Sequence, residues 1–137
     1  MKKFYLLGIF ITLSLLAAPL TAMPQQNEPA STQPSEVTTR NYPNPFNPAT
    51  NIEYELPWKA QVSIKIYNIV GQEIKDLVNE AKSDGQHSVE WDGTDNQNRA
   101  VVSGLYFYRL EATAVNPGQT ESADNTLTFT RKMNLIR

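Results

Sequence analysis

Residues 103–112 read Ser-Gly-Leu-Tyr-Phe-Tyr-Arg-Leu-Glu-Ala, a run rich in aromatic and apolar side chains. Alternate residues of a strand point to opposite faces of its sheet. Both alternating sets here contain large apolar groups: Tyr106, Tyr108 and Leu110 on one face, Leu105 and Phe107 on the other. Such a pattern is typical of a strand whose sheet is covered on both sides. We therefore predict a central strand, opened by the turn at Ser103-Gly104.

The same period-two alternation continues outward from this run. Polar and apolar residues alternate over 51–56, 62–66 and 87–91, and Pro, Gly, Asn or Asp residues lie between these stretches. Turn chemistry at 68–71, followed by a further apolar pattern over 73–78, predicts a hairpin. Each stretch has the length of a short strand with one face in a core.

The last run of the chain, Thr126 to Arg137, has the same character. One of its faces carries Leu127, Phe129, Met133 and Leu135, with Arg131 as the exception at its middle. Trp91 is predicted to lie at the centre of the core. About seven short strands, with turn signals roughly every 8 to 12 residues and no helical pattern of any length, are typical of a β-sandwich. The predicted fold class is therefore all-β.

The segment that precedes these strands is dominated by proline. Residues 41–48 read Asn-Tyr-Pro-Asn-Pro-Phe-Asn-Pro, and each X-Pro step fixes the proline φ and keeps the preceding residue out of the helical region. Neither a helix nor a paired strand is expected here. Asn44 and Asn47 are turn formers, and Tyr42 and Phe46 are predicted to pin the loop against the domain. The segment is expected to mark the entry to a domain at 41–137.

The first 22 residues have the three-part layout of a cleavable export signal. A basic start precedes an apolar run, and a small-residue exit follows it, with cleavage predicted after Ala22. The alternative is a permanent N-terminal anchor, although the apolar run is shorter than the ~20 residues that a spanning helix needs. Residues 23–40 are rich in Pro, Ser, Thr and Gln and are expected to form a disordered linker.

Composition narrows the classes of partner. The net charge is −2 and the basic residues are scattered, which argues against a nucleic-acid surface. The chain has no cysteine, so disulfides, zinc thiolates and a lipidated cysteine are excluded. We expect a secreted protein without stable membrane insertion, which passes through the periplasm to the outer cell surface or the medium.

Few residues suggest catalysis, metal binding or sugar binding. The single histidine, His87, is interpreted as a half-buried strand residue, because Ser88 points to the opposite face. The 92–98 loop offers carboxylate and amide oxygens to calcium but lacks the glycine and glutamate of an EF-hand, so a solvated turn is preferred. A sugar-binding face of tyrosines stays open. Its candidates are Tyr67, Tyr106 and Tyr108. We expect no enzymatic activity and no cofactor.

Five motifs in order carry a resemblance to a known family. They are Asn-Tyr-Pro-Asn-Pro-Phe-Asn-Pro-Ala-Thr (41–50), Ile-Tyr-Asn-Ile-Val-Gly-Gln-Glu (66–73), Val-Glu-Trp-Asp-Gly-Thr-Asp (89–95), the run 103–112 and Thr-Arg-Lys-Met-Asn-Leu-Ile-Arg (130–137). Together they resemble a type A C-terminal sorting domain of the type IX secretion system, which is similar to the immunoglobulin-like domain of the flagellar hook-capping protein. The structural motif residues are Tyr42, Pro43, Asn44, Pro45, Phe46, Asn47, Pro48, Gly71, Trp91, Asp92, Gly93, Gly104 and Tyr106.

The resemblance implies an address for secretion on an immunoglobulin-like sandwich of about seven strands. The Sec translocon would carry the chain across the inner membrane of a Gram-negative bacterium of the Bacteroidetes or related groups. The type IX translocon would then read the folded domain, and a sortase-like peptidase would remove it. The residues that the resemblance assigns to recognition are Lys132, Met133, Leu135, Ile136 and Arg137.

The residues themselves support edge recognition of the last strand by backbone pairing, with Met133 and Leu135 inward and Lys132 and Arg137 towards a receptor. The alternative is that this is only the last core strand. The alternative function is a non-catalytic structural or adhesive sandwich that binds a protein or glycan. The domain is expected to be a monomer.

Overall fold

Seven strands form in the part of the chain that the computed structural model describes, residues 36–115 and 126–137. They are β1 Thr38–Tyr42, β2 Thr50–Leu56, β3 Ala60–Asn68, β4 Glu73–Lys82, β5 Gly85–Trp91, β6 Gly104–Ala114 and β7 Thr126–Leu135. All of them belong to one compact unit that spans residues 32–137. The strand count and the absence of helix from these described ranges agree with the all-β prediction.

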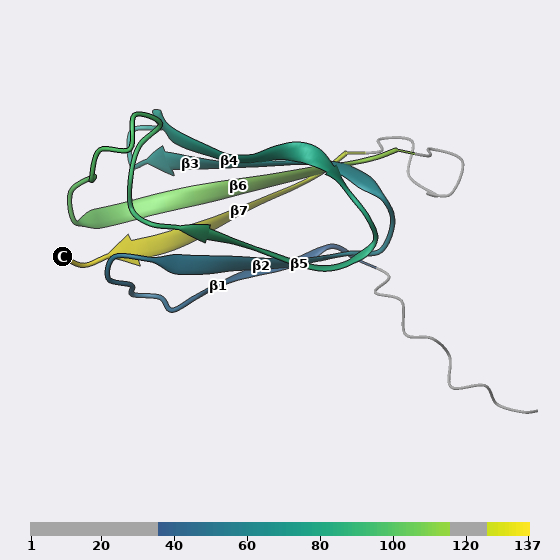
Figure 1. Cartoon of the computed structure of the whole chain (residues 1–137), viewed down its shortest axis with the longest axis horizontal. Helices are drawn as coiled ribbons and strands as arrows, with labels where there is room; N and C mark the ends of the chain where they lie inside the picture. Colours follow the sequence, from purple (N-terminus) through teal and green to yellow (C-terminus); the bar gives the residue numbers. More distant parts are fainter. Residues whose placement is uncertain (1–35, 116–125) are drawn as a thin grey trace, which may run out of the picture. The chain divides into compact units, whose positions relative to one another are not determined.

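Two antiparallel sheets pack face to face as two layers (Figure 1). One sheet has the order β1-β2-β5 and the other the order β4-β3-β6-β7. Strand β6 pairs with β3 on one side and β7 on the other, which confirms the predicted central strand. The β-sandwich is therefore confirmed, and no helix of the described residues is long and apolar enough to cross a membrane.

The inward faces follow the period-two alternation. Trp91, the predicted centre of the core, has no exposed surface, and Arg131 is the exposed exception on the inward side of β7. The side chains buried between the sheets include Ile52, Tyr54, Leu56, Val62, Ile64, Ile66, Tyr108, Leu110, Met133 and Leu135. Burial of these apolar groups is the main favourable term in the stability of a domain without disulfides.

The predicted hairpin joins β3 to β4. Asn68 closes its turn, because the Asn68 Oδ1 atom accepts the backbone N–H groups of Val70 (3.1 Å) and Gln72 (3.0 Å). Gly71 has a φ of +82°, a conformation that an L side chain rarely adopts, so the motif needs glycine at this position.

The prediction is wrong at the start of the domain. Strand β1 begins at Thr38, inside the expected linker, and it includes Asn41 and Tyr42, where no paired strand was expected. It pairs with β2, with Arg40 opposite Glu53, and Val37 before it is buried. The edge of β2 supplies backbone partners for this short polar segment, and local composition cannot reveal a partner supplied from elsewhere in the chain.

Some sequence predictions lie outside the described residues. They are the export signal with its cleavage at Ala22 and the part of the linker up to residue 35.

Candidate functional site

The five sequence motifs meet at one end of the sandwich around an aromatic cluster. The Trp91 ring contacts Phe46 at 5.5 Å between centroids and meets Tyr106 in an edge-to-face arrangement at 5.2 Å. The polar atoms of the cluster are also satisfied: the Trp91 indole N–H donates to the carbonyl of Thr94, and the Tyr106 hydroxyl donates to that of Val102. Aromatic pairs of this kind add stability beyond burial alone, so the cluster joins the three motifs that supply its rings.

The entry segment binds the outer edge of β7. The Asn44 side chain donates from Nδ2 to the Lys132 carbonyl (3.2 Å) and accepts at Oδ1 from the Asn134 N–H (3.0 Å). Phe46 continues the pairing, because its N–H donates to the Asn134 carbonyl and its carbonyl accepts from the Ile136 N–H. We call residues 44–46 the edge clamp.

The edge clamp changes the expected mode of recognition. The sequence predicts a terminal strand whose backbone edge another protein could pair with. That edge is already occupied at Lys132, Asn134 and Ile136, whose outward backbone groups bond to the clamp. In the folded domain, another protein could therefore pair with the backbone of these three residues only after displacing the clamp.

Other contacts hold the entry segment in place. The buried Thr50 hydroxyl donates to the Pro43 carbonyl at 2.7 Å. Phe46 is buried, as predicted for a residue that pins the loop, whereas the prediction for Tyr42 is wrong because 73% of its surface is exposed. Asn47 is exposed. The X-Pro peptide bonds before Pro43, Pro45 and Pro48 are all cis.

Arg137 closes the same end of the domain from the other side. Its backbone N–H donates to the Ser103 hydroxyl, and its guanidinium Nη2 donates to the Gly93 carbonyl at 2.8 Å. A Cβ atom on Gly93 would lie 2.8 Å from that Nη2 and 3.0 Å from the Pro48 carbonyl oxygen. Gly93 is thus required for this close approach. A receptor that takes the exposed Arg137 side chain must compete with the Gly93 carbonyl.

The other residues of the terminal motif divide by burial. Met133 and Leu135 are buried in the core, as predicted, so they support the strand and are not available to a receptor in the folded domain. Lys132, Asn134 and Ile136 are exposed. These three alternate with the buried pair and share the outward face of the strand.

A second asparagine binds the opposite edge of the same sheet. The Asn96 backbone N–H donates to the Ile74 carbonyl, and the Asn96 Oδ1 atom accepts the Asp76 N–H, both at 3.0 Å. Strand β4 is irregular along this stretch, with two register shifts against β3. Asparagine side chains thus cover parts of both edges of the four-stranded sheet, which blunts edges that would otherwise pair with other chains.

The carboxylates of the 92–98 loop are acceptors within the loop and for its neighbours. Asp92 accepts from the hydroxyl and the N–H of Thr94, and the hydroxyl bond is the main cause that lowers the Asp92 pKa. Asp95 accepts the N–H groups of Gln97 and Arg99, and the bond from Arg99 is the main cause that lowers its pKa. Both carboxylates therefore accept hydrogen bonds that form the turn. The sequence favours such a solvated turn over a calcium site.

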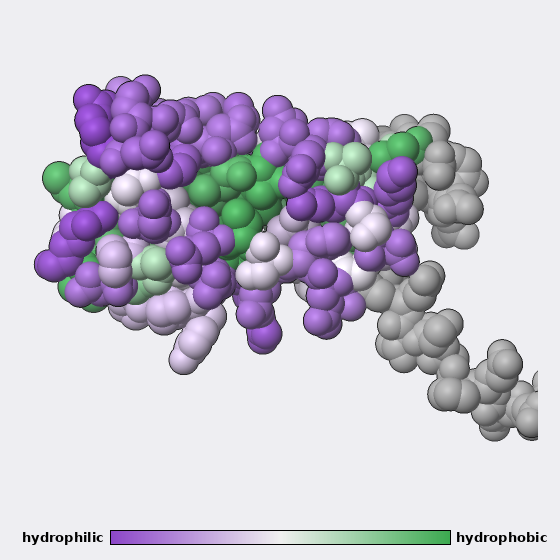
Figure 2. Space-filling view, viewed as in Figure 1, coloured by the Kyte–Doolittle hydropathy of each residue, from purple (hydrophilic) through white to green (hydrophobic). Residues whose placement is uncertain are grey.

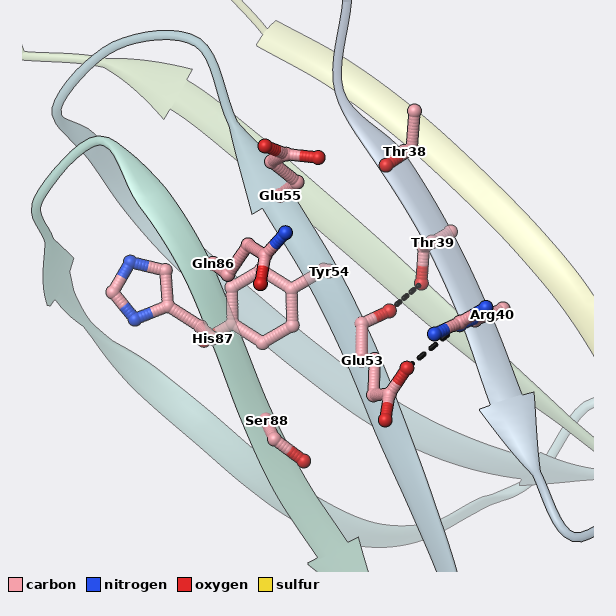
Figure 3. A pocket seen from close by; sticks show the side chains of 9 residues that line it. All are labelled: Thr38, Thr39, Arg40, Glu53, Tyr54, Glu55, Gln86, His87 and Ser88. Atoms are coloured by element: carbon pink, nitrogen blue, oxygen red, sulfur yellow. Dashed lines mark hydrogen bonds and ion pairs between the residues drawn. The ribbon is translucent and has the colours of Figure 1, made fainter. Parts of the chain in front are cut away.

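A shallow polar groove of about 580 Å³ lies over the β1-β2-β5 sheet (Figure 3). Arg40 and Glu53 are among its lining residues and form an ion pair at 2.6 Å, and Gln86 and Ser88 line it from β5. Figure 3 shows the imidazole of His87 turned away from Ser88. The two side chains do not come together as a catalytic pair would require.

His87 has a structural explanation. Its ring stacks on Tyr54 at 5.3 Å, and its Nε2 atom lies 2.8 Å from the Ser83 carbonyl. The predicted half-buried strand position is confirmed.

The tyrosine face left open by the sequence does not form. Tyr106 and Tyr108 are buried in the core, and the Tyr108 hydroxyl lies 3.1 Å from that of Thr39. Tyr67 lies on the outer face of β3, with the Arg109 guanidinium 5.1 Å from its ring centroid. Because the three rings point to two different sides of the sheet, they cannot form one stacking surface for a sugar.

A family model described as the FlgD Ig-like domain matches residues 46–118, more than half of the chain. Dimeric latent PorU from Porphyromonas gingivalis has a similar fold, with a TM-score of 0.56 at 16% identity over 73% of this chain and 9% of that chain. PorZ, an essential bacterial surface component of the type-IX secretion system of the same organism, gives a TM-score of 0.43 at 18% identity, over 72% of this chain and 11% of that chain. The chain thus spans about a tenth of the length of these proteins. No curated protein sequence matches it.

Proposed function

The chain belongs to the family of FlgD Ig-like domains, and we propose that its domain is a secretion address for a type IX secretion system. The observation that carries this proposal is the union of the two most distant motifs of the resemblance. Asn44 and Phe46 of the entry motif bond to the backbone of the terminal motif at Lys132, Asn134 and Ile136. The terminal motif is therefore presented in one fixed conformation by the folded sandwich.

The terminal strand suits recognition by side chains. Its buried members fix its position, while Lys132, Asn134 and Ile136 project from the domain. A rigid epitope binds a receptor with little loss of conformational entropy, because the clamp has already ordered it. On this proposal the Sec translocon reads the N-terminal signal, the type IX translocon reads the folded domain, and a sortase-like peptidase separates the domain from its cargo at the cell surface. The domain acts without catalysis of its own.

The proposal is tested with a cargo reporter. A reporter protein is inserted between residues 31 and 32, ahead of the compact unit, and the fusion is expressed in a bacterium with a type IX secretion system. We expect the reporter at the cell surface or in the medium, and its retention in the periplasm when the translocon is deleted. Equal export with and without the translocon contradicts the proposal.

Deletion of residues 132–137 is a poor test on its own. It removes Met133 and Leu135 from the core, and large core truncations cost about 2–5 kcal/mol each, enough to unfold a small domain. Trapped reporter would then report unfolding rather than loss of the address. Variants of exposed residues in a domain that still melts normally avoid this ambiguity.

The groove over the β1-β2-β5 sheet favours a second function, an adhesive sandwich that binds a glycan or protein through polar groups. Carboxylate, amide and hydroxyl groups line it from Glu53, Glu55, Gln86 and Ser88. Purified residues 36–137 would then bind a glycan array, and Glu55→Gln with Gln86→Ala would abolish the signal. Absence of binding by the unmodified domain contradicts the glycan-binding form of this second function.

A further inference from the structure

Exposed apolar side chains gather where β7 ends. Seven large hydrophobic residues are exposed in the described ranges, and five of them belong to this end of the four-stranded sheet. Figure 2 shows apolar atoms, in green, at the end where Figure 1 marks the C-terminus. We call these five residues the apolar end patch: Ile69, Val70, Val102, Leu105 and Ile136.

Strand register brings the apolar end patch together. Asn68 pairs with Tyr106, so the hairpin tip of Ile69 and Val70 continues past the level of Leu105. Leu105 pairs in turn with Asn134, which is two residues before Ile136.

The loop that carries Val102 is held at this end of the sheet by hydrogen bonds of two of its residues. The Val102 carbonyl accepts the Tyr106 hydroxyl, and the next residue, Ser103, accepts the Arg137 N–H. Three separate segments of the chain thus contribute to one end surface.

These side chains are not needed by the core. Ile69, Val70 and Val102 are each more than 70% exposed. Single exposed hydrophobic residues are common, but a contiguous group marks an interaction site. The edge clamp, which occupies the backbone edge of β7, leaves these side chains uncovered.

Basic residues lie beside the apolar end patch on the outer face of the sheet. Lys132 pairs with Phe107, the neighbour of Leu105 on that face, and Arg109 follows on the same strand face. Neither Lys132 nor Arg109 has a carboxylate partner within the described residues. Glu73 lies in the same row of this face as Lys132 but pairs with Lys65 at 2.9 Å, so the uncompensated charge at the border of the patch is the ammonium group of Lys132. A partner complementary to it offers carboxylates beside an apolar pocket.

We propose that the apolar end patch, with Lys132 at its border, docks into an apolar pocket rimmed by acidic residues on a protein of the secretion machinery. This inference rests on the proposed function and identifies the surface that is read. Apolar residues at the centre and charges at the rim are the usual anatomy of a specific protein interface. The recognised surface is then composite, formed by the hairpin tip, the loop before β6 and the last residues of the chain.

The test uses the cargo reporter with Val70→Ser and Val102→Ser combined. Neither side chain is buried, so the melting temperature is expected to stay unchanged, while the exported fraction falls at least about ten-fold. Lys132→Glu should lower export as well, and Lys132→Arg should not. The matched control is Val115→Ser, an exposed valine just beyond the opposite end of β6.

The possible outcomes distinguish failure of the docking surface from failure of the proposed function. Translocon-dependent export of the double variant at the level of the unmodified chain overturns the docking surface and leaves the proposed function standing. Translocon-independent export of the unmodified chain overturns both. If sedimentation shows a dimer that the double variant converts to a monomer, or if the unmodified domain binds anionic vesicles and the variant does not, the patch serves a second copy or a membrane, and the inference is wrong.

Discussion

The Asn44 side chain accepts the backbone N–H of Asn134, 90 residues further along the chain, at 3.0 Å. Its amide group also donates to Lys132, so one side chain takes the place of a neighbouring strand at the end of β7. Two sequence motifs at opposite ends of the domain are therefore parts of one structural unit. The conformation of the last residues depends on the entry segment.

Asn44→Ala should loosen the end of β7 without unfolding the domain. It removes two hydrogen bonds at an exposed position, for an expected loss of about 1 kcal/mol of unfolding free energy. Hydrogen exchange should accelerate at the amides of Asn134 and Ile136 and stay slow at Ile64 in the core. Asn47→Ala is the matched control, an exposed asparagine of the same motif. Unchanged protection at Asn134 contradicts the edge clamp.

Gly93→Ala should destabilise the domain more than Gly71→Ala. Both glycines have positive φ, which costs an alanine about 1–2 kcal/mol. Around Gly71 a Cβ atom meets nothing within 4 Å, whereas at Gly93 it meets Arg137 and the Pro48 carbonyl. This crowding should add about 1–3 kcal/mol, measured as the difference between the two variants in denaturant unfolding. Equal losses would mean that Arg137 moves aside freely.

Trp91→Ala should cost about 3–5 kcal/mol, because the side chain is fully buried and contacts both Phe46 and Tyr106. Tyr42→Ala should change the unfolding free energy by less than about 0.5 kcal/mol, because that ring is mostly exposed. Thermal or denaturant melts of purified residues 36–137 measure both. A large loss for Tyr42→Ala would instead mean that this ring pins the entry loop against the domain.

Acid should destabilise the 92–98 loop. The folded-state pKa values of Asp92 and Asp95 lie below the ordinary value of 3.8. Their contribution to stability is therefore complete above about pH 4 and is lost as the pH falls through the folded values. Melting temperatures between about pH 6 and pH 2 should drop most steeply below pH 4.

Asp95→Asn should lower the melting temperature at neutral pH and flatten this acid-induced drop. Asp84→Asn, in the exposed β4–β5 turn, is the control with the same change of charge. An unaltered acid profile for Asp95→Asn would show that other carboxylates control the transition.

The strands were predictable because their signal is local. The alternation of Ile52, Tyr54 and Leu56 with polar residues indicates which face of the strand is buried, without any knowledge of the residues that pack against it. Strand β1 was missed because its residues form a strand only when the edge of β2 is beside them. Tyr42 was misassigned for a related reason. An aromatic residue beside proline indicates a packing residue, but residues from other parts of the fold determine whether there is a cavity for its ring.

The candidate site was likewise predictable from the sequence only in part. The sequence by itself determined that Met133 and Leu135 face inward and that Lys132 faces outward, because strand periodicity fixes which side each residue takes. Only the tertiary structure decided that the backbone edge between them is closed by Asn44 and Phe46, and that Arg137 lies on Gly93. The side-chain contacts of Asn44 with Asn134 and of Arg137 with Gly93 span 90 and 44 positions of the sequence. At such separations the sequence pattern carries no geometric information until the two sheets have packed.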